Sequence, residues 1–153
     1  MKKFVLGFTL VEILVVTTII GMLAAVGSVS YTAFTKNARD ARRKADLEEV
    51  RGAMELYRSN NSTGYPSEGG GAADQIQFDC NATTGKLEDS NSNKYLSKIP
   101  EDPKCPTSTY DIISISASDY VLGARLEGGG TDCGGSCGGG NQCNYCLGPY
   151  GQQ

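Results

Sequence analysis

The chain begins with the stretch Lys2-Lys3-Phe4-Val5-Leu6-Gly7-Phe8-Thr9-Leu10-Val11-Glu12, and an uncharged, largely apolar run follows from Ile13 to Thr35. A membrane span needs about 20 apolar residues at about 1.5 Å per residue, so this run is long enough to cross a bilayer. A carboxylate at the front of such a run is costly in lipid unless a cation pairs with it. Glu12 is therefore the residue that a membrane anchor alone does not explain.

Three interpretations of this stretch compete. The first is a secretory signal peptide, with a basic start and a small-residue cleavage site at Ala25-Val26-Gly27, although the apolar run is longer than usual. The second is a plain signal anchor, in which Glu12 marks the headgroup boundary. The third is a leader over residues 1–7, whose removal after Gly7 would create a new ammonium group on Phe8. That cation would lie four residues before the carboxylate, on its own chain or on a neighbour's, and could pair with it.

The helical pattern continues past the apolar run. No proline occurs between Met1 and Tyr65, and the polar segment 60–64 stops the pattern. We expect one helix from near Phe8 to near Ser59, which would span the membrane over 8–35 and be amphipathic over 36–60. Its second half carries one apolar stripe at helical spacing, formed by Leu47, Val50, Met54 and Tyr57.

Two alternating segments read as strands. They cover Tyr110–Ile115 and Asp119–Glu127, and a short turn at 116–118 joins them as a hairpin. Their apolar residues would cover the helix stripe, which predicts an α+β fold: a long helix packed on an antiparallel sheet of about three or four strands. The small head would extend over residues 61–127, followed by a tail over 128–153 that is rich in glycine and cysteine.

Six cysteines follow the apolar run, and an even number fits an oxidising compartment. Cys80 and Cys105 are separated from the others, and we expect them to pair, with about 3 to 4 kcal/mol of stabilisation in the chain-entropy model. Disulfides are favoured for the other four, but four thiolates could also bind zinc, and their connectivity cannot be read from spacing. These four are Cys133, Cys137, Cys143 and Cys146.

Composition excludes several classes of function. The 153 residues include no histidine, so the usual general base and His-ligated metals are missing, and no nucleophile–base pair supports an enzyme. The formal charge is −3, and no basic run occurs outside residues 36–44, which argues against a nucleic-acid surface. Lys2 and Lys3 favour a cytoplasmic N-terminus, but the five cations within 36–44 oppose that orientation by count alone.

The segment Lys3–Val16 resembles the prepilin signal of type IV pilins and type II secretion pseudopilins, in which a basic leader ends in Gly and Phe-Thr-Leu-x-Glu opens a long apolar helix. Met54–Tyr57 followed by Gly64-Tyr65-Pro66, and Tyr95–Pro103, also resemble the pseudopilins. The major pseudopilins usually continue with a Trp-Gly-x-Pro-Tyr run, where this chain has Lys104-Cys105-Pro106.

The resemblance implies roles for three residues. Gly7 would be the last leader residue, read by a prepilin peptidase, and Phe8 would be the new N-terminus, which that enzyme also N-methylates. Glu12 would pair with the Phe8 amine of an adjacent subunit during assembly. Some family members bind calcium in a loop near the end of the chain, for which Glu127, Asp132 and Asn141 could supply oxygen ligands.

The implied function is structural: a subunit of a type IV pilus-like or type II secretion pseudopilus filament. Its partners would be identical subunits, minor pilins, an assembly platform with an ATPase, and the cytoplasmic membrane, which a single span would cross with an extracytoplasmic head. The assembled filament would be periplasmic or at the cell surface. The motif does not separate a pilus from a secretion pseudopilus or a DNA-uptake filament. The alternative is a membrane-anchored, extracytoplasmic binding module that uses the cysteine-rich tail with disulfides or zinc.

Overall fold

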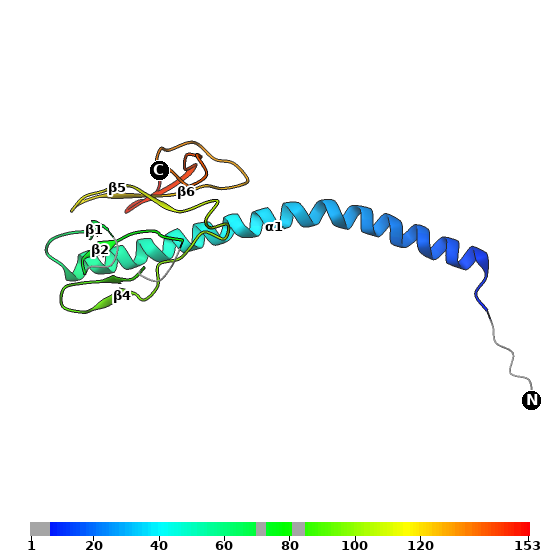
Figure 1. Cartoon of the computed structure of the whole chain (residues 1–153), viewed down its shortest axis with the longest axis horizontal. Coiled ribbons are helices and arrows are strands. Elements are labelled where there is room, and N and C mark those ends of the chain that lie inside the picture. The colour runs from blue at the N-terminus through cyan, green and yellow to red at the C-terminus, as the bar shows by residue number, and fades with distance from the viewer. Residues whose placement is uncertain (1–6, 70–72, 81–84) are drawn as a thin grey trace, which may run out of the picture. The chain divides into compact units, whose positions relative to one another are not determined.

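The computed structural model describes residues 7–69, 73–80 and 85–153, and only the backbone of residues 28–30. By contacts the chain divides into two units, Met1–Lys36 and Asn37–Gln153, and each is described by itself. The long helix α1, Leu10–Asn60, contributes to both (Figure 1). The predicted leader over residues 1–7 therefore lies almost wholly outside the described residues.

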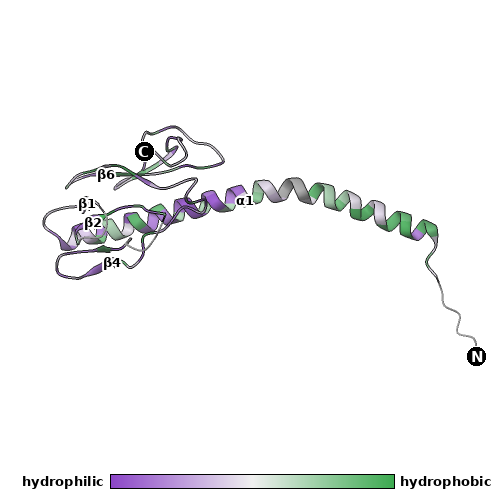
Figure 2. Cartoon of the chain, viewed as in Figure 1, coloured by the Kyte–Doolittle hydropathy of each residue, from purple (hydrophilic) through white to green (hydrophobic). Residues whose placement is uncertain are grey.

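The first half of α1 is an apolar helix whose described side chains are exposed. Figure 2 shows its hydrophobic colouring giving way to hydrophilic residues along the second half. Its described side chains up to Phe34 are exposed, and its length and composition suit it to cross a membrane. A helix that is apolar all round and uncovered by its own chain needs lipid or other helices around it.

The second half of α1 packs into the head through the predicted stripe. Leu47, Val50 and Met54 are fully buried, and Tyr57 is 1% exposed. The helix ends where the amide of Asn61 donates to the carbonyl of Tyr57 through both its backbone and its side chain. The observed end, Asn60, lies one residue from the expected end near Ser59. The Asn61 side chain stabilises this end, since it donates to a carbonyl of the last helical turn.

A four-stranded antiparallel sheet covers the stripe, which confirms the α+β class. Its strands lie in the order β5-β6-β7-β8, and the hairpin expected near residue 116 joins the first two. The four are β5 (Asp111–Ile115), β6 (Tyr120–Ala124), β7 (Tyr145–Gly148) and β8 (Gly151–Gln152).

Two short strand pairs lie in the long connection between α1 and this sheet. The pair β1 (Ser67–Glu68) and β2 (Gln75–Ile76) is parallel, whereas β3 (Leu87–Glu88) and β4 (Lys94–Leu96) are antiparallel. In Figure 1, β4 lies on the opposite side of α1 from β5 and β6. Ile76, Leu87 and Leu96 join the same core as the stripe, so the head buries α1 from more than one side.

The tail differs from the separate segment that was expected over 128–153. Its last part supplies β7 and β8, and Leu147 on β7 is buried in the main core. The part between β6 and β7 folds onto the other face of the sheet, where its cysteines pack against Ile113 and Val121 in a second, smaller core. The sequence shows no alternation of apolar and polar residues in this part. Its buried contacts come instead from cysteine sulfur atoms that pack on the sheet.

Candidate functional site

The N-terminal segment forms a capped helix start. The backbone N–H of Glu12 donates to Thr9 Oγ1 at 3.2 Å, and the N–H of Ile13 donates to the Thr9 carbonyl at 3.3 Å. Thr9 is therefore the N-cap of α1, which begins at Leu10, two residues after the expected start. The signal for this cap was present in the sequence as Thr-x-x-Glu, the pattern of a capping box.

This geometry changes how Phe8 and Glu12 relate. Phe8 precedes the helix, so the two residues are not an i, i+4 pair on one helical face in the uncleaved chain. Phe8 is 79% exposed, and a side chain built on Gly7 would meet no atom within 4 Å. Among the described residues, Gly7, Phe8 and Glu12 are all exposed.

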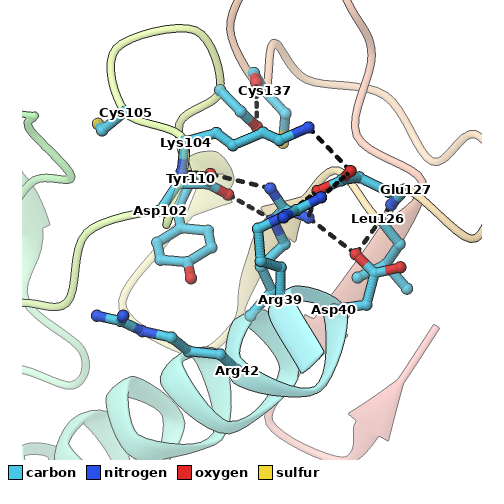
Figure 3. A network of polar contacts seen from close by, with 12 residues as sticks. Arg39, Asp40, Arg42, Asp102, Lys104, Cys105, Tyr110, Leu126, Glu127 and Cys137 are labelled. Carbon is cyan, nitrogen blue, oxygen red and sulfur yellow. Dashed lines mark hydrogen bonds and ion pairs between the residues drawn. The ribbon is translucent and has the colours of Figure 1, made fainter. Parts of the chain in front are cut away.

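A cluster of charged side chains lies in the head, and no local sequence pattern predicted it. Arg43 is only 1% exposed and makes a two-pronged contact with Asp102: Nε donates to Oδ2 at 2.6 Å and Nη2 to Oδ1 at 3.1 Å. Its Nη1 donates to Asp40 Oδ1 at 2.8 Å and to Glu127 Oε1 at 3.1 Å. The Arg43 guanidinium thus joins α1, the loop before β5 and the segment that follows β6. Figure 3 shows its partners Asp40, Asp102 and Glu127.

Glu127 is ion-paired with the remaining cations of this cluster. Arg39 donates to both of its carboxylate oxygens, at 2.6 and 2.7 Å, and Lys104 donates to Oε2 at 2.8 Å. The hydrogen bond from Arg39, with help from Lys104 and Arg43, holds the pKa of Glu127 well below its usual range. Asp40 also accepts the backbone N–H groups of Glu127 and Gly128, at 2.9 and 2.8 Å.

This network bears on the cations within residues 36–44, whose number opposes a cytoplasmic N-terminus. Arg39 and Arg43 count as cations near the membrane in the sequence, but in the folded head they are ion-paired with Glu127, Asp102 and Asp40. Burial lowers the pKa of Arg43, but the hydrogen bonds and charge of Asp102 outweigh it, so the pKa is raised. The folded head therefore presents fewer free cations than the sequence count indicates.

All six cysteines form disulfides. Cys80 is bonded to Cys105, the pair that the sequence placed together, with Cα atoms 5.5 Å apart. The tail cysteines form two nested bridges, Cys133–Cys146 and Cys137–Cys143, with Cα separations of 6.3 and 5.1 Å. All three separations lie within the usual range for a disulfide. The bridges use all the tail sulfurs, so no thiolate remains for zinc in this state.

The three candidate calcium ligands lie in different surroundings. Glu127 faces the cations described above, and the side-chain amide of Asn141 donates to the carbonyls of Gly138 and Gly139. Asp132 is exposed in the tail. Across the described ranges, no group of three or more acidic or thiol side chains is arranged to hold a metal ion.

Comparison with known proteins gives one match. The chain is 32% identical over 132 residues to the type II secretion system core protein G of Pseudomonas aeruginosa, and the alignment covers 82% of this chain and 88% of that protein. No protein-family model matches the chain, and no solved structure matches it.

Proposed function

Because the chain belongs to the type II secretion core protein G family, the pseudopilins, we propose that it is a subunit of a secretion pseudopilus that polymerises through α1 after its leader is removed. One observation carries this proposal. Gly7, Phe8 and Glu12 are exposed at the start of a capped helix, and the described side chains of its apolar half are exposed too.

The chemistry of that segment supports assembly. Cleavage after Gly7 produces an ammonium group on Phe8, and Glu12 offers a carboxylate of opposite charge. Since both lie in an apolar setting, each is costly unless paired, and a neighbouring subunit can supply the partner. The first two turns of α1 keep Glu12 near the helix N-terminus, where the helix dipole also favours a negative charge.

The same reasoning gives the role and location that we propose. The role is structural rather than enzymatic, since the sequence holds no histidine and the buried charged groups Arg43, Asp40 and Asp102 are engaged with one another in ion pairs. The chain would be anchored in the cytoplasmic membrane by α1, with the head outside the cytoplasm, where disulfides persist. Its partners would be a prepilin peptidase, identical subunits, minor pseudopilins and the assembly platform.

Mass spectrometry of the mature chain tests the leader. We expect an N-terminus at Phe8 that carries one added methyl group, as the family resemblance implies. A mature chain that keeps Met1, or one that begins at Ser28, would contradict the proposal.

Substitution of Glu12 tests its role in assembly. We expect Glu12→Ala to insert into the membrane normally but to form no filaments, because the Phe8 ammonium loses its partner. Thr18→Ala is the matched control, since Thr18 is an exposed, uncharged residue of the same apolar helix, whose hydroxyl donates to the Val15 carbonyl at 2.8 Å. Electron microscopy and shearing of cells measure the filaments. Normal filaments from Glu12→Ala would show that the carboxylate is not the assembly residue.

A further inference from the structure

The two tail bridges are covered by the sheet on which they pack. Cys137 and Cys143, which form the inner bridge, are both 0% exposed. In the outer bridge Cys146 is 1% exposed and Cys133 is partly exposed. The sulfur of Cys143 lies so close to β6 that a side chain on Gly123 would collide with it. Because a disulfide opens when a thiolate attacks one of its sulfur atoms, the fold protects the inner bridge from exchange.

The third bridge, Cys80–Cys105, has different surroundings. Both of its cysteines are partly exposed, and Cys105 lines an open groove of about 560 Å³ between α1 and the loop that leads to β5. Neither cysteine is among the residues of the two buried cores. Figure 3 shows Cys105 at the side of the ion-pair network, on the loop that also carries Asp102 and Lys104. A thiolate can therefore approach Cys105 from solvent while the sheet stays folded.

The turn that ends at Cys105 brings the buried carboxylate of Asp102 to Arg43. The backbone N–H of Cys105 donates to the Asp102 carbonyl at 3.0 Å, and the backbone N–H of Lys104 donates to Asp102 Oδ1 at 2.7 Å. The bridge fastens the end of this turn to Cys80. A buried ion pair is favourable only in good geometry, so a covalent restraint on the turn that carries one partner supports the pair.

We propose that Cys80–Cys105 is a site of thiol–disulfide exchange with an extracytoplasmic dithiol protein, and that its opening weakens the pair between Asp102 and Arg43. The stability of the head then depends on the redox state of this one bridge, while the inner tail bridge stays closed. The inference goes beyond the proposed filament role, and it does not depend on Glu12 or on assembly.

The exchange runs in two steps. One thiolate of the partner attacks the Cys105 sulfur, which forms a mixed disulfide and breaks the bond to Cys80, and the Cys80 sulfur leaves as a thiolate that takes up a proton. The second thiol of the partner then loses its proton and attacks the mixed disulfide, which releases Cys105 as a thiolate that is protonated in turn. Two electrons pass from the dithiol to the bridge, the partner is left as a disulfide, and the reverse steps close the bridge.

Differential alkylation of the full chain in detergent measures the order in which the bridges open. The chain is treated with dithiothreitol, quenched with N-ethylmaleimide at successive times and analysed at each cysteine by mass spectrometry. We expect Cys80 and Cys105 to be labelled about tenfold faster than Cys137 and Cys143, with the outer tail bridge in between. Equal rates for all three bridges, or earlier opening of a tail bridge, would overturn the proposal.

A thioredoxin-type protein whose second cysteine is replaced by serine tests exchange with a dithiol protein, because its reaction stops at the mixed disulfide. We expect a covalent complex with the wild-type chain in which the bond maps to Cys105. The double variant Cys80→Ser/Cys105→Ser keeps the four tail cysteines and should give no complex. A complex that maps to a tail cysteine, or no complex with the wild-type chain, would contradict the assignment.

Melting temperatures test the link between the bridge and Arg43. The double cysteine variant and Arg43→Met should each lower the melting temperature, and their combination should lower it by less than the sum, because both changes act on Asp102. The control combines the double variant with Arg42→Met, where the two changes should add. Additive losses with Arg43→Met would show that the bridge does not act through the buried pair. Circular dichroism of the full chain in detergent measures all of these variants.

Discussion

Arg43 carries a full charge into the interior of the head, and this is possible because three carboxylates surround it. Asp102 is fully buried, while Asp40 and Glu127 keep 12% and 15% of their side chains exposed. A buried ion pair contributes little compared with a well-packed apolar pair, but removal of one partner leaves an unpaired charge. The network therefore affects the stability of the head mainly because removal of any one member would leave an unpaired buried charge.

We expect Arg43→Met to destabilise the head by about 3 to 5 kcal/mol, because Asp102 then remains buried without a cation. Arg42→Met is the matched control one residue earlier. Its side chain is 63% exposed, so its loss should change stability by less than about 1 kcal/mol. Denaturant unfolding of the full chain in detergent, followed by tyrosine fluorescence, measures both. Equal effects would show that the network does not hold the head together.

Two carboxylates should make the head sensitive to acid. The side chain of Asn93, with other donors in the same turn, lowers the pKa of Asp89 from 3.8 to about 2, and the pKa of Glu127 is lowered too. Both carboxylates bind protons more readily in the unfolded chain. Their stabilisation is therefore complete above the ordinary carboxyl pKa, near 4, and is lost as the pH falls towards 2.

We expect the melting temperature to fall steeply between pH 4 and pH 2, with a shallower fall in Asp89→Asn, which removes one of the two titrating groups. Thermal unfolding by circular dichroism across this range measures the slopes. An identical slope in the variant would show that Asp89 does not contribute to the acid sensitivity of the head.

At the scale of elements, the end of α1 depends on one glycine. Gly64 has a φ of 95°, and a side chain there would collide with the carbonyl oxygen of Ala117 in the β5–β6 turn. The next residue, Tyr65, donates its backbone N–H to that same oxygen at 3.1 Å. The chain after α1 therefore turns where it meets the β5–β6 hairpin, and glycine at this position permits the close approach.

Gly64→Ala should destabilise the head by more than about 1 kcal/mol, because the backbone must move and the hydrogen bond from Tyr65 is strained. Gly52→Ala provides the opposite control. Gly52 lies within α1 with open space around it, so alanine there should stabilise the chain by about 0.5 to 1 kcal/mol. Thermal melts of the two variants should therefore shift in opposite directions, and shifts of the same sign would contradict the geometry.

At the scale of the whole molecule, the chain after Glu127 is part of the head rather than an appendage. It supplies β7, which pairs with β6, and its disulfides cover the outer face of the sheet. The buried side chains of Tyr145 and Leu147 each contribute about 1.5 to 3 kcal/mol, a large share of the 5 to 15 kcal/mol that stabilises a typical domain.

A chain that ends after Glu127 should therefore fail to fold its head, whereas a chain that ends after Gly151 keeps β7 and both tail disulfides and should fold. Limited proteolysis of membranes that contain each form distinguishes them, because an unfolded head is digested down to α1. A protease-resistant head in the shorter form would restore the view of 128–153 as a separate tail.

Local patterns in the sequence were sufficient to predict α1 and the β5–β6 hairpin, whereas the roles of Gly7, Phe8 and Glu12 stay predictions. Helical hydrogen bonds join residues four apart, and a hairpin joins neighbours, so each pattern lies within one short window. The cap at Thr9 was not predicted, although Thr-x-x-Glu is the pattern of a capping box. Cys80 and Cys105 could be paired because both stand apart from the remaining cysteines.

Only the tertiary structure decided the partners of Arg43, the pairing of the tail cysteines and the membership of β7 in the sheet. Arg43 meets Asp102 and Glu127 across separations of 59 and 84 residues, and nothing in the intervening sequence marks those carboxylates as its partners. Such contacts depend on how the sheet and loops close around α1. Composition and spacing thus predict the long helix α1, while the head acquires its buried charges and its tail strands through packing between distant segments.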